Sequence, residues 1–292
     1  MKEKNTERQE LKANILFSGI GSQEIGIKEA GLPRLKVMST SEIDSSAVLT
    51  NAIIHYGLTQ KMVEDFRDYP DTDIMVRELT EKNIGFNPKT GKAYDWARHK
   101  RRGILHIRRV WLAVHLTRNL GDISRIEKLP CADLWTVSFP CQDISNAGKR
   151  GGFEKDSGTK SSLVWEQIRL LKKAVSDGEA PAVLMFENVK GLVQKNFIKD
   201  FQMLCGRLSE LGYNTYYKVL NAKDFGVPQN RERVFAYCIR KDADNGTYTF
   251  PEPTGIRTSL DDILDPKHAS KTRTYSKGAA KAASTGVQGH GR

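Results

Sequence analysis

A chain of 292 residues with 39% hydrophobic content is long enough to bury a substantial core, which excludes a protein that is disordered throughout. No apolar run approaches the roughly 18 to 20 residues that span a bilayer, and the charged N-terminus does not resemble a signal peptide. We therefore expect a cytoplasmic protein with no membrane partner. The net charge of +11 favours a polyanionic partner, and four cysteines without CxxC spacing indicate reduced thiols and no metal site.

Short apolar runs alternate with helical patterns along most of the chain. They predict strands at 13–17, 35–40, 134–139, 182–186, 215–220 and 234–239, and helices at 23–30, 45–55, 162–175 and 197–211. Ser22 is placed to cap the first of these helices. Such alternation is typical of a doubly wound α/β fold, in which helices cover both faces of a mostly parallel sheet.

Two segments do not follow this alternation. Residues 65–119 carry a basic cluster and the apolar series Ile104, Ile107, Trp111 and Val114 at helical spacing, so we interpret them as a helical insertion. Its charges are either a solvated face, which is the commoner case, or phosphate contacts. Residues 266–292 form a basic, low-complexity tail that cannot bury a core. We therefore expect a charged leader at 1–12, one α/β domain at 13–265 and this tail.

The turn at 17–22 reads Phe-Ser-Gly-Ile-Gly-Ser and joins a predicted strand to a helix. Gly19 and Gly21 would let a ligand approach the backbone at a helix N-terminus, although an ordinary tight turn explains them equally well. Glu42 follows the next strand, where a carboxylate can accept hydrogen bonds from both hydroxyls of a ribose. Together, the glycine turn and Glu42 suggest a nucleoside-containing cofactor. Asp122, in another polar turn, is either a further carboxylate at this edge or only a turn former.

Cys141 directly follows a predicted strand, in the sequence Ser-Phe-Pro-Cys-Gln. Pro140 turns the chain out of the sheet, which leaves Cys141 at the strand exit, placed to react. Residues 143–158 are rich in Gly, Ser, Asn, Asp and Lys and are typical of a loop that closes over a substrate. The other cysteines lack this context: Cys131, Cys205 and Cys238.

Charged residues lie beside the predicted strands at 182–186 and 234–239. Glu187 is expected to end the strand at 182–186, where an apolar surrounding would favour the neutral, proton-donating carboxyl. Arg231 and Arg233 enter the final strand at a spacing of two, which places both on one face. Such guanidinium groups can brace a carboxylate or grip a phosphate and a base.

In chain order these motifs together resemble the DNA cytosine-5 methyltransferases. The motifs are FSGIGS at 17–22, Glu42-Ile43-Asp44, Gly121-Asp122-Ile123, PCQ at 140–142, Glu187-Asn188-Val189 and QNRER at 229–233. The resemblance covers 13–253, apart from the insertion, and implies a Rossmann-like fold. It also implies S-adenosylmethionine as the cofactor and a cytosine flipped out of double-stranded DNA as the substrate.

The resemblance implies a role for each motif residue. The cofactor-binding residues would be Phe17, Gly19, Gly21, Glu42, Ile43, Asp122, Pro140 and Leu163. The catalytic residues would be Cys141, Glu187, Arg231 and Arg233, and the substrate contacts Gln142, Ser145 and Gln229. Phe17 would stack on the adenine, Glu42 would bind the ribose and Asp122 the adenine amino group. Cys141 would be the nucleophile that adds to C6 of cytosine.

The sequence also departs from the family pattern. Ile15 and Ser22 replace an aspartate and a glycine of the first motif, and after 259–264 the chain has only the basic tail where the family continues into a target-recognition domain. We therefore expect a truncated or split member, with a second chain carrying the recognition domain as a further partner, and sequence-blind DNA binding by this chain alone. The alternatives are a catalytically silent cofactor- or DNA-binding remnant and one subunit of a split methyltransferase.

A third reading, a nicotinamide dehydrogenase with a catalytic cysteine, is disfavoured because only Gly19 and Gly21 match its fingerprint. The resemblance favours a bacterial or phage-encoded protein of DNA methylation and restriction-modification. The target sequence is not predicted.

Overall fold

The computed structural model describes residues 10–31, 34–87, 90–100, 103–140 and 163–263. The chain forms two compact units, the larger from residues 1–220 and 232–251 and the smaller from 221–231 and 252–292. The predicted basic tail lies outside the described residues, as does most of the charged leader. Within the described ranges, no helix is both long and apolar enough to cross a membrane.

Six strands form one sheet in the order β2-β1-β3-β4-β6-β5. They are β1 Leu11–Leu16, β2 Leu35–Ser41, β3 Leu134–Val137, β4 Val183–Val189, β5 Tyr213–Asn221 and β6 Glu232–Arg240. Strands β2, β1, β3 and β4 are parallel, and β6 runs antiparallel to β4. Since β2 and β3 lie on opposite sides of β1, the winding direction reverses at β1, which creates a crevice at the carboxyl ends of β1 and β3.

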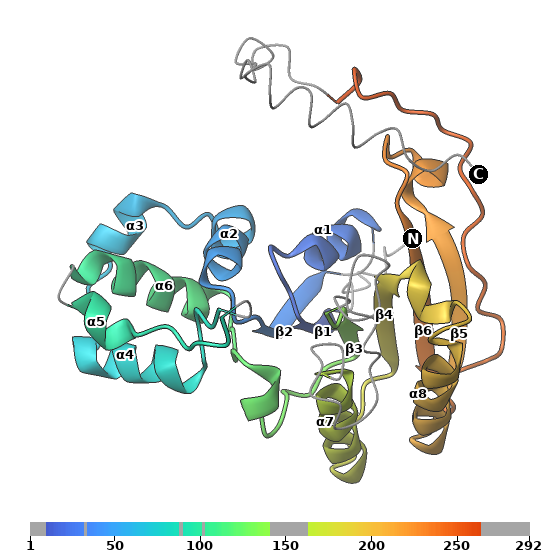
Figure 1. Cartoon of the computed structure of the whole chain (residues 1–292), viewed down its shortest axis with the longest axis horizontal. Coiled ribbons are helices and arrows are strands. Elements are labelled where there is room, and N and C mark those ends of the chain that lie inside the picture. The colour runs from blue at the N-terminus through green and yellow to red at the C-terminus, as the bar shows by residue number, and fades with distance from the viewer. Residues whose placement is uncertain (1–9, 32–33, 88–89, 101–102, 141–162, 264–292) are drawn as a thin grey trace, which may run out of the picture. The chain divides into compact units, whose positions relative to one another are not determined.

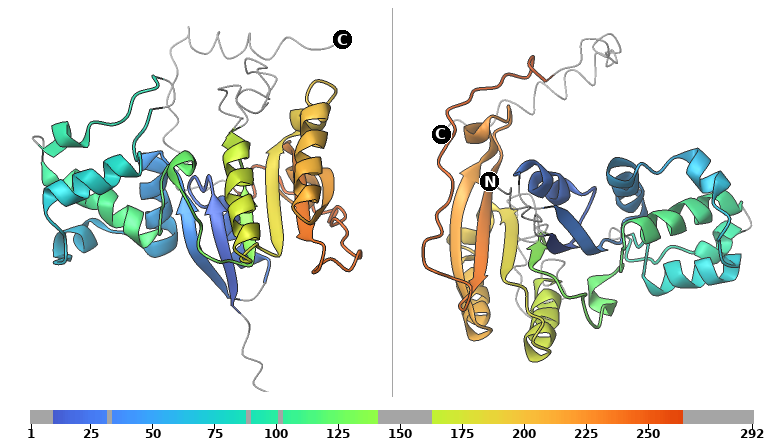
Figure 2. Two further views of the ribbon diagram at one scale, coloured as in Figure 1. Left: turned by 90° about the horizontal axis from the view of Figure 1, so that it is seen from below. Right: turned by 180° about the vertical axis from the view of Figure 1, so that it is seen from behind.

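Helices cover both faces of this sheet, as a doubly wound fold requires. Helices α7 (Val164–Ser176) and α8 (Ile198–Glu210) lie on one side, and α1 (Ser22–Glu29) lies on the other (Figures 1 and 2). Helix α7 buries Val164, Ile168 and Leu171, which recur at helical spacing and pack in the same apolar cluster as Trp135 of β3. The predicted α/β class with a mostly parallel sheet is therefore confirmed.

The segment between β2 and β3 is helical and has its own core. Its helices are α2 Ser45–Tyr56, α3 Gln60–Asp65, α4 Thr72–Glu81, α5 Trp96–Lys100 and α6 Ile104–Leu116. Ile107, Trp111 and Val114 of α6 are buried in a cluster to which all five helices contribute. The helical insertion predicted from this spacing is confirmed. One of its arginines has a partner within the insertion, because the Arg108 guanidinium lies 4.8 Å from the centre of the Tyr69 ring.

Three local predictions were wrong. Ser22 does not cap α1, because Gly21 occupies that position with a φ of 89° and no side-chain cap bond forms. Strand β3 ends at Val137, two residues earlier than predicted. Strand β4 continues through Glu187 and Asn188, since both residues pair with β6 and the backbone ladder extends beyond the apolar run.

Candidate cofactor pocket and active site

A cavity of about 340 Å³ lies beyond the carboxyl ends of β1, β2 and β3, in the larger unit. Its walls are Phe17, Ser41, Glu42, Ile43, Asp44, Phe86, Gly121, Asp122, Ile123, Ser138, Pro140 and Leu163. The structure thus brings together six of the eight cofactor residues proposed from the sequence, from five separate parts of the chain. The place is where open α/β sheets bind ligands, and the volume is within the usual range of about 300 to 1,000 Å³ for ligand pockets.

The two predicted residues that do not line the cavity, Gly19 and Gly21, shape the loop beside it. Phe17, Gly19 and Gly21 have φ angles of 54°, 53° and 89°, so the chain enters the left-handed region three times in five residues. An aromatic residue rarely adopts this conformation, and such strain is concentrated at functional sites. The loop is held in place because the Gly19 N–H donates to Glu42 Oε2 at 3.0 Å.

A glycine is also required at position 21 because there is no space for a side chain. A Cβ atom at this position would overlap the side chains of His55 and Asn51 on α2. Helix α2 therefore packs directly against the glycine loop, and any other residue at position 21 must displace it.

Glu42 is a carboxylate held by backbone donors. Its Oε1 accepts hydrogen bonds from the N–H groups of Ile43 and Asp44, both at 2.8 Å, and its Oε2 accepts the bond from Gly19. Burial raises the pKa of Glu42 above its ordinary value, and the three backbone N–H groups offset only part of this effect. The side chain is therefore fixed at the cavity wall by backbone hydrogen bonds.

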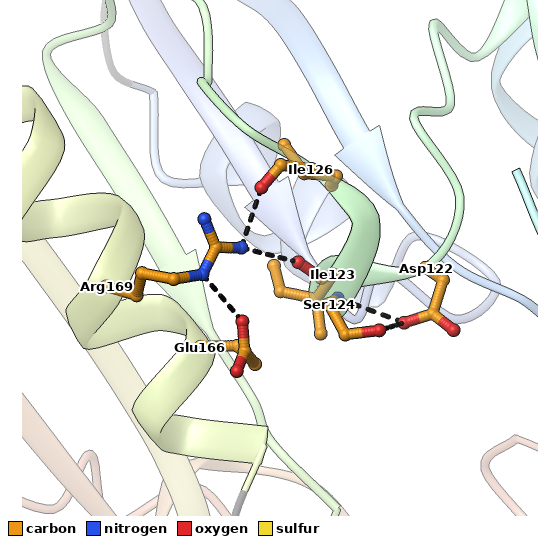
Figure 3. Close-up of polar contacts among 6 residues, drawn as sticks. All are labelled: Asp122, Ile123, Ser124, Ile126, Glu166 and Arg169. Carbon is orange, nitrogen blue, oxygen red and sulfur yellow. Dashed lines mark hydrogen bonds and ion pairs between the residues drawn. The ribbon is translucent and has the colours of Figure 1, made fainter.

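Asp122 is both a cavity residue and a turn former. Its Oδ1 accepts hydrogen bonds from Ser124 N at 3.0 Å and Ser124 Oγ at 2.7 Å (Figure 3). Its Oδ2 accepts one from Asn83 Nδ2 at 2.7 Å. Burial raises the pKa of Asp122, but these hydrogen bonds outweigh burial and hold it below its ordinary value. The sequence left open whether Asp122 is a carboxylate at this edge or a turn former, and in the structure it is both.

Arg169 on α7 fixes the short 3-10 turn that follows Asp122. Its Nη2 donates to the carbonyl oxygens of Ile126 at 2.7 Å and Ile123 at 3.3 Å, while its Nε pairs with Glu166 at 2.7 Å (Figure 3). Leu163 lies just before the same helix and lines the cavity. Helix α7 thus supplies one wall and braces another.

Phe86 and Asn119 are among the residues that shape the cavity and that sequence reasoning missed. Phe86 lines it from the insertion, where no periodic pattern marks a lone aromatic residue between Gly85 and Asn87. Asn119 is buried and ties the end of β2 to the Gly121 turn, since its Oδ1 accepts from Glu42 N and Gly121 N, both at 3.0 Å. Such a bridge joins segments far apart in sequence and leaves no local signal.

The proposed nucleophile and two substrate contacts lie outside the described residues: Cys141, Gln142 and Ser145. Pro140, which precedes Cys141, lines the cavity. The described cysteines near the core are poor nucleophiles, because burial raises the pKa of Cys205 to about 11 and that of Cys238 to about 12. Cys131 is exposed.

Glu187 is paired with an arginine. Arg233 Nε lies 3.1 Å from Glu187 Oε1, between adjacent strands β4 and β6, and each side chain is about a quarter exposed. The expected apolar strand end is therefore wrong: the carboxyl lies within a strand and beside a guanidinium. The pairing agrees with the other expectation, that an arginine here braces a carboxylate.

Arg231 and Gln229 belong to the smaller unit. Arg231 precedes β6, so it does not share a strand face with Arg233 as the spacing of two suggested. Its backbone N–H donates to Asn221 Oδ1 and its carbonyl accepts from Ala222 N, both at 3.0 Å, which closes a loop. Gln229 is exposed within that loop.

Comparison with known proteins agrees with the motifs. The chain is 38% identical over 257 residues to the type II methyltransferase M2.ScrFI of Lactococcus lactis subsp. cremoris, covering 87% of this chain and 68% of that protein. It is 28% identical to the orphan methyltransferase M.SssI of Spiroplasma monobiae, covering 86% and 65%. A solved Escherichia coli structure, described as a DNA modification methyltransferase encoded within a prophage, gives a TM-score of 0.48 at 20% identity, covering 87% and 54%.

The chain therefore spans about two thirds of the length of the first and second of these proteins. Residues 107–289 match the family described as C-5 cytosine-specific DNA methylase. The matched range contains β3 to β6, the cavity residues from Gly121 onward and the Glu187–Arg233 pair. The family match covers more than half of the chain, and the first relative exceeds 30% identity over most of its own length. The chain belongs to the C-5 cytosine-specific DNA methylase family.

Proposed function

We propose that this protein transfers a methyl group from S-adenosylmethionine to C5 of cytosine in DNA through a covalent adduct with Cys141. The observation that carries the proposal is the cavity at the winding reversal of the sheet. The aromatic ring of Phe17 and the hydrogen-bonded carboxylates of Glu42 and Asp122 meet there in a chain of this family.

The residues of the cavity suit an adenosyl group. Phe17 offers a ring face to adenine, Glu42 offers carboxylate oxygens to the ribose hydroxyls, and Asp122 offers an acceptor to the adenine amino group. Glu42 Oε1 already accepts two hydrogen bonds, whereas Oε2 accepts only the one from Gly19, so a ribose hydroxyl would donate to the second lone pair of Oε2. When bound, S-adenosylmethionine supplies the methyl group as an electrophile on its sulfonium.

Cytosine C5 is too electron-poor to accept this methyl group unaided, so the protein must first raise its electron density. The Cys141 thiolate forms a bond to C6 while N3 takes a proton that Glu187 relays from solvent, and the electron pair of the C5–C6 double bond becomes available at C5. C5 would then take the methyl group that the sulfonium supplies, with the methyl–sulfur bond breaking and its electron pair remaining on sulfur. Water removes the C5 proton, the electron pair restores the double bond, the C6–sulfur bond breaks to release the thiolate, and N3 returns its proton.

Arg233 has two tasks in this scheme. At 3.1 Å from Glu187 it orients the carboxyl, and its remaining N–H groups are donors for cytosine O2. Neither task can be done on a base that is stacked in a duplex. The cytosine must therefore be flipped out, at a cost of a few kcal/mol, and the net charge of +11 supplies attraction to the phosphate backbone.

The test is transfer of tritium from methyl-labelled S-adenosylmethionine to mixed-sequence DNA, and in parallel to RNA, by the full chain, with Cys141→Ser as the control. We expect label at C5 of cytosine, lost in the variant. Because the chain spans about two thirds of its relatives, the assay is run with and without the chain encoded immediately downstream. Binding of the labelled cofactor without transfer in either mixture would instead identify a catalytically silent remnant, and transfer to RNA alone would reject DNA as the substrate.

We further propose a cytoplasmic role in DNA methylation, as part of restriction-modification. The support is that the relative from Lactococcus lactis is named a type II methyltransferase. Sequencing of methylated sites in the host genome tests this role, since a modification enzyme marks every copy of one short target.

A further inference from the structure

The turn 82–86, which follows α4 in the insertion, forms part of the cavity wall. Phe86 lines the cavity and is half-buried, so part of its ring is available to a ligand. Phe86 is also separate from the apolar cluster that holds the described helices of the insertion together. Its placement is therefore not explained by packing of the insertion core.

Backbone contacts fix this turn against the strand end that carries Glu42. The Gly85 N–H donates to the carbonyl oxygen of Ile43 at 2.6 Å. Ile43 follows Glu42 directly and lines the same cavity. The residue that precedes Phe86 is thus bonded to the part of the chain proposed to hold the ribose.

The other end of the turn is fixed against Asp122. Asn83 donates its amide N–H to Asp122 Oδ2 at 2.7 Å, and the Asp122 backbone N–H donates to the carbonyl oxygen of Lys82 at 3.0 Å. The two backbones approach so closely that a Cβ atom at Gly121 would overlap Lys82. The turn is therefore bonded to both carboxylate-bearing segments of the cavity.

The insertion holds the turn from behind. Trp96 Nε1 donates to the carbonyl oxygen of Ile84 at 2.8 Å, and Ile84 is fully buried. Gly85 lies so close to Tyr94 that a Cβ atom there would be 2.9 Å from the tyrosine Cβ. Since the backbone that leads into Phe86 is fixed at residues 82–85, the ring is largely pre-organised for a ligand.

We infer that Phe86 packs on the adenine ring of the cofactor, so that the insertion supplies a binding residue to the methyl-transfer site. The inference rests on the proposed function, because it needs an adenosyl ligand in this cavity. A flat, apolar ring with a hydrogen-bonding edge matches the cavity's composition, in which Phe17 and Phe86 are the aromatic residues and Glu42, Asp44 and Asp122 the carboxylates. Aromatic side chains stack on nucleobases in this way, without depending on the identity of the base.

The experiment is calorimetric titration of the full chain with S-adenosylhomocysteine, which shares the adenosine part and is not consumed. Phe86→Leu keeps an apolar side chain but removes the ring face. The matched control is Phe66→Leu, the same change at a half-buried ring that packs on Tyr69 and Trp111 in the insertion core and does not line the cavity. Phe86→Ala provides a second, larger truncation.

We expect Phe86→Leu to weaken binding about fivefold and Phe86→Ala about tenfold or more, which corresponds to about 1.4 kcal/mol per factor of ten. We expect Phe66→Leu to lower the melting temperature and leave the dissociation constant within about twofold. Equal binding by wild type and folded Phe86 variants would overturn the inference, as would equal weakening by Phe66→Leu. Failure of the wild type itself to bind S-adenosylhomocysteine would reject the proposed cofactor instead.

Discussion

Arg233 Nε lies 3.1 Å from Glu187 Oε1, on neighbouring antiparallel strands of the sheet. The pair is held by backbone pairing of β4 with β6, so its geometry does not depend on a loop. An acid that must deliver a proton to one ring nitrogen needs this kind of fixed orientation. The pairing of β4 with β6 therefore holds Glu187 and Arg233 in the geometry that the proposed proton transfer requires.

Removing the acid should affect the chemical step and not cofactor binding. We expect Glu187→Gln to lower the single-turnover rate of methyl transfer by about 10² to 10⁴-fold, because the amide cannot protonate N3. Binding of S-adenosylhomocysteine should be unchanged, since Glu187 does not line the cavity. Rapid-quench measurement of labelled DNA gives the rate, and calorimetry gives the affinity.

The control uses the neighbouring ion pair Lys190–Glu232, at 2.9 Å, which is exposed and has no proposed role. Lys190→Gln should leave the rate within about twofold, because exposed ion pairs contribute little. A wild-type rate in Glu187→Gln would remove Glu187 from the mechanism.

Cofactor affinity should depend on pH through Glu42. The ribose hydroxyls donate to the ionised carboxyl, and burial raises the pKa of Glu42 in the free protein. Affinity for S-adenosylhomocysteine should therefore fall as the pH is lowered through this raised pKa, above the ordinary carboxyl value of about 4.3. Glu42→Gln should bind more weakly by about 1 to 3 kcal/mol and lose this dependence.

Stability should respond to pH in the opposite direction. A carboxyl whose pKa is raised in the folded state stabilises the fold most below about pH 4.3, and this contribution is lost as the pH rises through the folded pKa. The difference in unfolding free energy between wild type and Glu42→Gln, measured by urea titration without ligand, isolates this group from the other carboxyls. If neither affinity nor that difference changes with pH, the assignment of Glu42 to the ribose is wrong.

Much of the fold follows from local patterns, whereas part of the site does not. The parallel strands are short apolar runs, and their carboxyl ends necessarily meet at one edge, which predicts the position of Glu42. Asp122 instead lies in the turn between α6 and β3, so strand ends alone do not place it at this edge. Glu187 was placed at a strand end because polar residues interrupt the apolar run, but pairing with β6 extends β4 past them. That pairing is a property of the sheet and not of the segment.

Contacts between distant segments also explain why the set of cavity residues predicted from the sequence was incomplete. Phe86 reaches the cavity only because Asn83 and Gly85 are bonded to Asp122 and Ile43, which are distant in sequence. No spacing rule predicts contacts of this range. Backbone strain cannot be predicted from the sequence either, because the positive φ of Phe17 is seen only in the folded backbone.

A covalent adduct should form at one cysteine. DNA that carries 5-fluorocytosine at the target site should trap the full chain, because fluorine cannot leave as a proton and elimination stalls. Cys141→Ser should abolish the complex on a denaturing gel. Cys205→Ser and Cys238→Ser should retain it, because burial raises the pKa of these thiols to about 11 and about 12.

Trapping that survives Cys141→Ser and is lost in another cysteine variant would identify a different nucleophile. Exposed Cys131 is the remaining candidate, so Cys131→Ser is included. If all four single variants trap equally, no single cysteine is required for the adduct, and the assignment of Cys141 as the nucleophile is rejected.

Two glycines five residues apart in the first βα unit should respond in opposite ways to alanine. Gly21 has a φ of 89°, and its Cβ would overlap His55 and Asn51, so Gly21→Ala should reduce the free energy of unfolding by about 2 to 4 kcal/mol. Gly26 lies within α1 and a Cβ there meets nothing within 4 Å. Gly26→Ala should therefore increase the free energy of unfolding by about 0.5 to 1 kcal/mol, because alanine has the higher helix propensity.

Urea unfolding of the two variants beside wild type provides the measurement, and calorimetry with S-adenosylhomocysteine shows whether the loop has moved. Gly21→Ala should also weaken this ligand, since the Gly19 N–H that holds Glu42 lies in the same loop. Gly26→Ala should bind as wild type does. If Gly21→Ala proved as stable as wild type, α2 would not pack against the loop as described, and the pre-organisation of the cofactor pocket would need another cause.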